Sequence, residues 1–194
     1  VVRPHRLERT SPLVVVVMDF VRGATLRSVL AHCGRLQPTA VIEIVEACST
    51  ALEESAVLGL THLQLRPECL MIDREQRLRI LGFGQRELAR AAVRGSTPAH
   101  WFHIAPEVAA GAPDDPRMDV FALGVLAHEL LCGHVPDHAG EARPSGPTEY
   151  RPTAAEDLAP PVREVLERAF AASPAERFAR ATEFAAALRQ ALVG

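Results

Sequence analysis

The sequence contains no lysine, and all 21 of its basic residues are arginine. No side-chain amine is therefore available to hold a phosphate group, and any such contact falls to a guanidinium. With 24 acidic residues the formal net charge is −3, so the chain lacks the excess positive charge that marks proteins binding nucleic acid or anionic lipid. Neither class of partner is expected.

Cysteine pairs and long apolar runs are also lacking. The four cysteines form no CxxC pair, so neither a zinc ribbon nor a disulfide framework is expected. The longest apolar run, Leu13–Met18, is far too short to cross a bilayer. We expect a cytoplasmic segment without membrane contact. Because the chain starts at Val1 rather than methionine, it can also be the cytoplasmic part of a larger or membrane-anchored protein.

What the sequence does contain is a series of helical patterns. Apolar spacing and end signals predict helices over 25–33, 38–58, 117–132, 161–171 and 182–192. Ser173 and Glu176 match a capping box, and Gly133 is a stop signal. A β-branched run over 13–21 predicts a buried strand, 69–73 and 77–81 predict a small hairpin, and 135–156 predict a loop. The fold class is therefore α+β, mainly α, with one or two small β hairpins.

Five motifs follow one another in a fixed order. These are "HLQLRPEC", "LGFG", "GSTPAHWFHIAPE", "DVFALGVLAHELLCGHVP" and "SPAERF". They resemble the HRDLKPEN, LDFG, GTPxYxAPE, DxxSLGxxLxELLxGxxP and DPxxRF motifs of protein kinases, with two extra residues in the third. The chain as a whole resembles the larger, C-terminal lobe of the eukaryotic-like serine/threonine kinases of bacteria.

The resemblance implies a division of the chain. Residues 1–22 correspond to a remnant of the small-lobe strands and the hinge, and 23–194 to the large lobe, with most of the small lobe missing. Within the lobe, 61–72 correspond to the catalytic loop, 81–84 to the metal-binding motif and 85–107 to the activation segment.

Several residues that carry the family's chemistry are replaced. Gln64 stands where the family has its catalytic-base Asp, Cys69 where it has the magnesium-binding Asn, and Gly82 where it has the Asp of the DFG motif. Leu63 replaces the Arg that reads a phosphorylated activation loop, and Arg66 replaces the phosphate-directed Lys. An amide cannot take a proton at neutral pH, and neither a thiol nor a glycine suits magnesium. We expect no catalytic residues, no enzyme activity and no use of Mg-ATP.

The positions that hold the lobe together, by the same resemblance, are kept. They include an expected buried ion pair between Glu107 and Arg177. The full set is His62, Pro67, Phe83, Gly84, Ala105, Pro106, Glu107, Asp119, Gly124 and Arg177.

Two further clusters were weighed. His128, Cys132, His134 and His138 fall within eleven residues, but core or surface roles are favoured over a metal site, so no metal is expected. Trp101 and Phe102 are candidate docking residues, with packing onto the lobe as the alternative. Ser96 and Thr97 precede a proline, as phosphorylated residues do in related kinases, although their internal reader is replaced by Leu63.

These observations predict a pseudokinase, a protein-interaction or regulatory module whose partner is a protein, for example a kinase or another signalling protein. One alternative is a portion of a divergent serine/threonine kinase whose small lobe lies upstream. A second is a sensor that binds ATP without turnover.

Overall fold

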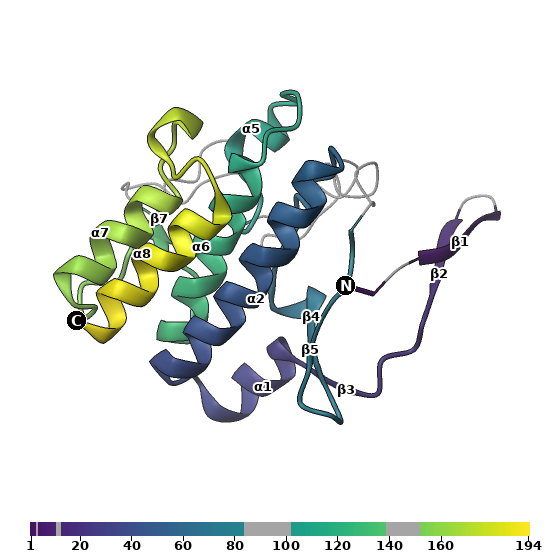
Figure 1. The fold of residues 1–194 in the computed structure, drawn as a ribbon, viewed down its shortest axis with the longest axis horizontal. Helices are drawn as coiled ribbons and strands as arrows, with labels where there is room; N and C mark the ends of the chain where they lie inside the picture. Colours follow the sequence, from purple (N-terminus) through teal and green to yellow (C-terminus); the bar gives the residue numbers. More distant parts are fainter. Residues whose placement is uncertain (3, 11–12, 84–101, 139–151) are drawn as a thin grey trace.

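The computed structural model describes residues 1–2, 4–10, 13–83, 102–138 and 152–194. Its helices gather into one body, and the hairpin of β1 (Pro4–Thr10) and β2 (Leu13–Met18) stands to one side of it (Figure 1). Gly84, Ser96, Thr97 and Trp101, for which the sequence raised expectations, lie outside the described residues. No helix in the described ranges has the length and apolar character needed to cross a membrane.

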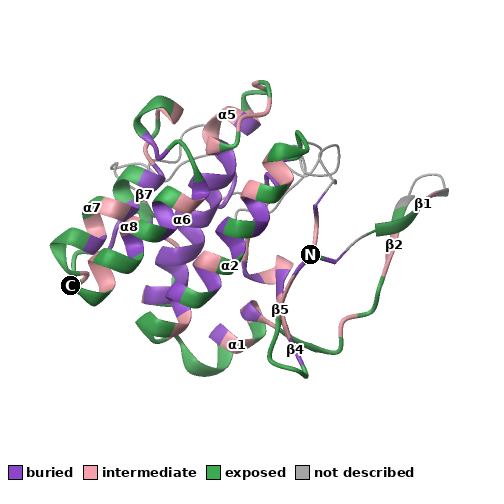
Figure 2. Ribbon diagram, in the orientation of Figure 1, coloured by how far each residue is buried: buried purple, intermediate pink, exposed green. Residues whose placement is uncertain are grey.

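Helix α6 (Arg117–Cys132) is the centre of the core. Every residue from Met118 to Leu131 is buried, which agrees with an apolar sequence that leaves no polar face. Figure 2 shows this helix as an almost continuous buried ribbon with other helices around it. A Cβ at Gly124 would lie 2.7 Å from the Cβ of Ala169, so the glycine allows α7 (Pro160–Ala169) to approach closely.

The first two helices follow their local signals. In α1 (Leu26–Cys33) the Thr25 side chain accepts a hydrogen bond from the Ser28 N–H, as an N-cap should. Helix α2 (Pro38–Val57) begins with proline in its first turn and packs one apolar face on α6 and α8 (Ala181–Val193). Gly133 ends α6 in the left-handed region with φ of 85°.

The expected hairpin is present as β4 (Leu70–Asp73) and β5 (Leu78–Ile80). It gains a third antiparallel strand, β3 (Gly23–Thr25), from the segment before α1. A one-turn 3₁₀ helix, η1 (Pro67–Cys69), leads into β4. The hinge-like segment, residues 19–22, leads into β3, and β3, η1 and the start of α1 contact one another beside the helical body (Figure 1).

The remaining described elements are short. They are α5 (Pro106–Ala109), β6 (Asp137–His138), β7 (Pro152–Thr153) and the 3₁₀ helix η2 (Pro174–Glu176). Strands β6 and β7 pair with each other inside the segment expected to be a loop. Their pairing is set by a contact across the intervening chain, which periodicity does not reveal.

Two local expectations are wrong. The strand over 13–21 ends at Met18 and is not buried, since Val15 is 43% exposed and Val16 to Met18 are only half-buried. The capping box is absent because Ser173 makes no side-chain cap bond and η2 is a single turn. Arg177 immediately after it is extended, so the helix ends after that one turn.

Candidate functional site

The segment expected to correspond to the catalytic loop, which begins at residue 61, is bound to α6 through a buried carboxylate. Asp119, in the first turn of α6, accepts hydrogen bonds from the His62 N–H at 2.8 Å and the Leu63 N–H at 2.7 Å. Burial raises the pKa of Asp119 to about 6, although both N–H bonds act in the opposite direction. The bonds fix the loop backbone to the central helix.

Leu63 shows how the loop has changed. Its backbone lies in the left-handed region with φ of 65°, a conformation that a branched apolar residue rarely adopts. Its side chain is fully buried in the core. The two hydrogen bonds of Asp119 stabilise the loop that carries this conformation. Leu63 therefore packs inward and is absent from the lining of the cavity beside the loop.

A cavity of about 200 Å³ opens beside this loop. Its walls come from the end of β2, the catalytic-loop equivalent, η1 and the segment after β5. The lining residues are Met18, His62, Gln64, Arg66, Glu68, Cys69, Leu81 and Gly82. The structure therefore brings together four of the five replaced positions, and Leu63 alone is turned away.

His62 lines the cavity and binds two backbone groups through its ring nitrogens. Its Nε2 donates to the Leu81 carbonyl at 2.8 Å, and its Nδ1 accepts from the Gln64 N–H at 3.4 Å. The edge of its ring meets the ring of Phe83 with centroids 4.8 Å apart. Burial lowers the pKa of His62 to about 4, so the ring is uncharged at neutral pH.

The cavity residues do not fit a magnesium ion. Gly82 has no side chain and a φ of 102°, and an added Cβ would lie 3.2 Å from the His62 ring. The Cys69 thiol donates to the Gln64 carbonyl at 3.3 Å, and burial raises its pKa, so it stays a protonated, soft group. Within the described ranges, no three His, Cys, Asp or Glu side chains are grouped to hold a metal.

The histidine cluster of α6 is structural where it is described. His128 Nδ1 contacts the His134 carbonyl at 3.1 Å, and its Nε2 accepts from the Ala155 N–H at 2.9 Å. Both ring nitrogens are therefore engaged in holding neighbouring backbone.

The ion pair between Glu107 and Arg177 is present and bidentate, with distances of 2.6 and 3.0 Å. Arg177 also donates to the carbonyls of Ala171, Arg117 and Ala172, and its guanidinium lies over the Phe121 ring. The Arg177 side chain has no exposed surface. This contact joins α5, α6 and the segment around η2.

The end of the activation-segment equivalent is packed inward. Phe102 packs, partly buried, against the core rather than forming an exposed anchor. His103 is buried, with its Nε2 3.0 Å from a carboxylate oxygen of Glu129 in α6. Glu129 is also bonded to Arg27, which in turn bonds Glu68. The sequence did not indicate this group of three side chains, because they are far apart along the chain.

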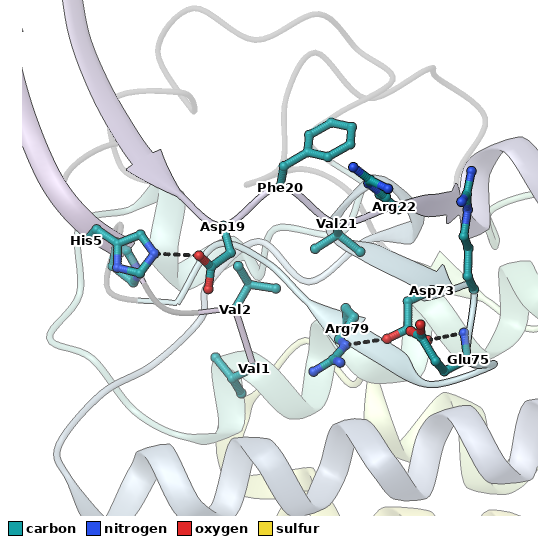
Figure 3. A pocket seen from close by; sticks show the side chains of 12 residues that line it. Val1, Val2, His5, Asp19, Phe20, Val21, Arg22, Asp73, Glu75 and Arg79 are labelled. Carbon is teal, nitrogen blue, oxygen red and sulfur yellow. Dashed lines mark hydrogen bonds and ion pairs between the residues drawn. The ribbon is translucent and has the colours of Figure 1, made fainter.

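A second cavity, of about 820 Å³, lies at the hinge-like segment and was not expected from the sequence (Figure 3). Residues 19–22 form one side and the β4–β5 turn another. Asp19 contacts His5 at 2.7 Å, and Asp73 binds Arg79 at 2.7 Å, so the carboxylates of both are already paired. Neither aspartate lines the first cavity.

Comparisons with known proteins agree with this architecture. The model of the protein kinase domain matches residues 1–187. The serine/threonine-protein kinase PknA of Mycobacterium tuberculosis is 31% identical over 92% of this chain and 43% of its own length. PknB of Mycolicibacterium smegmatis is 31% identical over 91% of this chain and 30% of its own. The crystal structure of the M. tuberculosis PknI kinase domain superimposes with a TM-score of 0.74 at 28% identity, over 98% of this chain and 71% of that one.

These matches correct two expectations. The relatives are serine/threonine protein kinases by name, and a kinase is an enzyme, so the expectation of no enzyme is wrong. Protein kinases take phosphate from Mg-ATP, which overturns the expectation of no cofactor. The chain spans less than half the length of these curated relatives. A family match over nearly its whole length shows that the chain belongs to the protein kinase family.

Proposed function

We propose that this chain is the large-lobe part of a divergent serine/threonine protein kinase that transfers phosphate from ATP to a hydroxyl group of a protein. Residues 23–194 form the lobe in this proposal, and 1–22 contribute small-lobe strands and the hinge. The observation that carries the proposal is the loop fixed by Asp119 beside a cavity that contains Arg66. In protein kinases the loop at this position orients the accepting hydroxyl group toward the phosphates of ATP.

Arg66 supplies the positive charge of the cavity. Its side chain is mostly buried, with 22% exposed, and no lysine exists to take its place. A planar guanidinium suits phosphate oxygens because it presents several N–H donors in a fork. Arg66 is therefore the group that attracts the phosphates of the donor.

Gln64 orients the accepting hydroxyl in this proposal. Its amide can accept or donate a hydrogen bond, but it cannot take the proton at neutral pH. Positioning alone accounts for a large part of phosphoryl-transfer catalysis, whereas general-base help is worth about 10²- to 10⁴-fold. Transfer is thus expected to be slow. No step is assigned to magnesium, since Cys69 and Gly82 do not form a site for it.

The partner is a protein substrate. In this proposal the chain binds that substrate at the end of the activation-segment equivalent, where α5 begins and where Glu107 is fixed by Arg177. A rigid platform suits the presentation of an extended peptide, because reacting groups must be held at about 3 Å for transfer.

The test is the incorporation of labelled phosphate from ATP into the chain itself and into a basic protein. Wild type is compared with Arg66→Ala, which removes the cavity cation, and with Arg189→Ala, which removes an exposed arginine on α8. We expect slow incorporation that Arg66→Ala reduces by at least about tenfold and Arg189→Ala leaves unchanged. Incorporation equal in wild type and Arg66→Ala, or none in either, contradicts the proposal.

A further inference from the structure

Arg27, at the start of α1, joins two carboxylates from distant parts of the chain. Its Nε donates to Glu68 Oε1 at 2.8 Å, and its NH1 donates to Glu129 Oε1 at 2.6 Å. Glu68 belongs to η1 beside the 200 Å³ cavity, and Glu129 to the buried face of α6. One guanidinium therefore bridges the cavity wall and the central helix.

The second oxygen of each carboxylate lies near another basic side chain. Glu129 Oε2 lies 3.0 Å from His103 Nε2. Glu68 Oε2 lies 3.7 Å from Arg66 Nε, and in the described part of the chain neither of these two buried atoms has a hydrogen-bond partner. Arg66 is thus close to Glu68 without being bonded to it.

Glu68 is hydrogen-bonded by Arg27, whereas Arg66 lies farther from it. Burial alone would raise the pKa of Glu68, but the hydrogen bond from Arg27 and the charges of both arginines hold it below its ordinary value, so the group is ionised. If Arg27 did not hold Oε1, the carboxylate could turn toward Arg66 and form a short, charge-assisted pair. Arg66 would then be less available to an anion in the cavity.

We propose that Arg27 is a positioning residue: by holding Glu68 it keeps the Arg66 guanidinium available to phosphate groups in the cavity. The proposal rests on the proposed function, in which Arg66 attracts the donor phosphates. It assigns Arg27 no contact with substrate, since Arg27 does not line the cavity.

The test is a binding cycle with inorganic tripolyphosphate as the probe, measured by calorimetry without metal. The variants are Arg27→Gln, Glu68→Gln and the two combined, with Arg66→Gln as the variant that loses the binding cation. We expect Arg27→Gln to weaken binding by about fivefold, the scale of one partly exposed ion pair. With Glu68→Gln already present, Arg27→Gln should change the affinity by less than about twofold, because nothing remains to capture Arg66.

The non-additive pattern separates this role from simpler ones. Loss of a distant positive charge, or general loosening of the fold, would weaken binding equally in both backgrounds, and that result overturns the proposal. An unchanged affinity in Arg27→Gln, or no probe binding by wild type, also overturns it. If Arg27→Gln fails to fold, Arg27→Lys keeps the charge but cannot bridge both carboxylates, and the same cycle applies.

The two proposals can fail separately. Absence of phosphate transfer with the binding cycle as expected would remove the kinase activity and leave the role of Arg27 intact. Normal transfer with an additive cycle would do the reverse.

Discussion

Arg177 and Asp119, which hold the α6 scaffold, differ from Arg66 and Glu68, which line the cavity, in how completely their polar groups are engaged, although Arg117 Nε and Glu129 Oε2 of α6 also lack a hydrogen bond among the described residues. On the scaffold, Arg177 uses its guanidinium on Glu107 and on three carbonyls, and Asp119 binds two loop N–H groups. In the cavity, Arg66 Nε and Glu68 Oε2 are buried without a hydrogen bond among the described residues. Buried polar groups cost free energy when unpaired. The scaffold is built for stability, and the cavity retains groups that a ligand can satisfy.

The comparison also shows which replacements the fold tolerates. Leu63 packs into the core and the Cys69 thiol donates to the Gln64 carbonyl, whereas Gly82 leaves only backbone beside the His62 ring. Each of these residues lies in the loop or beside the cavity. Changes in the scaffold should therefore affect stability, and changes in the cavity should affect rate.

The largest effect is expected from breaking the ion pair of Glu107 and Arg177. Either single change to alanine leaves a buried charge unpaired and should lower the free energy of unfolding by about 3 to 5 kcal/mol. The double variant should cost less than the sum. The control is Arg180→Ala, which breaks an exposed pair with Glu53 and should cost less than about 1 kcal/mol in denaturant unfolding. Equal midpoints for Arg177→Ala and this control would refute the distinction.

The second prediction concerns pH. The pKa of His62 is lowered from 6.5 to about 4 on folding, so its stabilisation is complete above pH 6.5 and is lost as pH falls to about 4. The stability of wild type minus that of His62→Gln should fall by about 3 kcal/mol between pH 7 and pH 4.

The difference between the two proteins is needed because Asp119 acts in the opposite sense. Its pKa is raised to about 6, so its contribution grows as pH falls below that value and is lost as pH rises through it. Urea unfolding of both proteins across this range is the measurement. A difference that stays constant with pH would show that His62 is not a buried neutral ring.

A third, smaller effect is expected at Gly124. A methyl group there would lie 2.7 Å from the Cβ of Ala169 in α7, so Gly124→Ala should destabilise by about 1 to 3 kcal/mol through overpacking. Adding Ala169→Gly should recover part of that loss in thermal unfolding. A double variant no more stable than Gly124→Ala would show that the contact between α6 and α7 is not limiting.

The smallest effect in free energy is expected in the cavity. Gln64→Asp supplies a carboxylate that can take a proton and should raise phosphate transfer by at least about tenfold, with stability changed by less than about 0.5 kcal/mol. Gln64→Asn, which shortens the side chain without adding a base, is the control. A loss of stability comparable to the scaffold variants would erase the distinction between the two regions.

Much of the fold could be predicted from local signals. Thr25, Pro38 and Gly133 mark helix ends in the sequence and do so in the structure. The first two motifs contain Gln64, Arg66, Cys69 and Gly82, which line the cavity. They could be identified from the sequence because each motif is a short local segment. The capping box expected at Ser173 is absent, since η2 is a single turn followed by the extended Arg177, whose side chain pairs with the distant Glu107.

The sequence by itself determined the helices, the motif order and the absence of carboxylates at positions 64 and 82, because these depend on residue identity and short-range spacing. Only the tertiary structure decided that Arg27 binds Glu68 and Glu129, that β3 joins the β4–β5 hairpin, and that Val15 stays exposed. The physical reason is that side-chain partners, strand neighbours and burial are set by packing between segments far apart in the chain. No local pattern encodes which of several arginines will reach a given carboxylate.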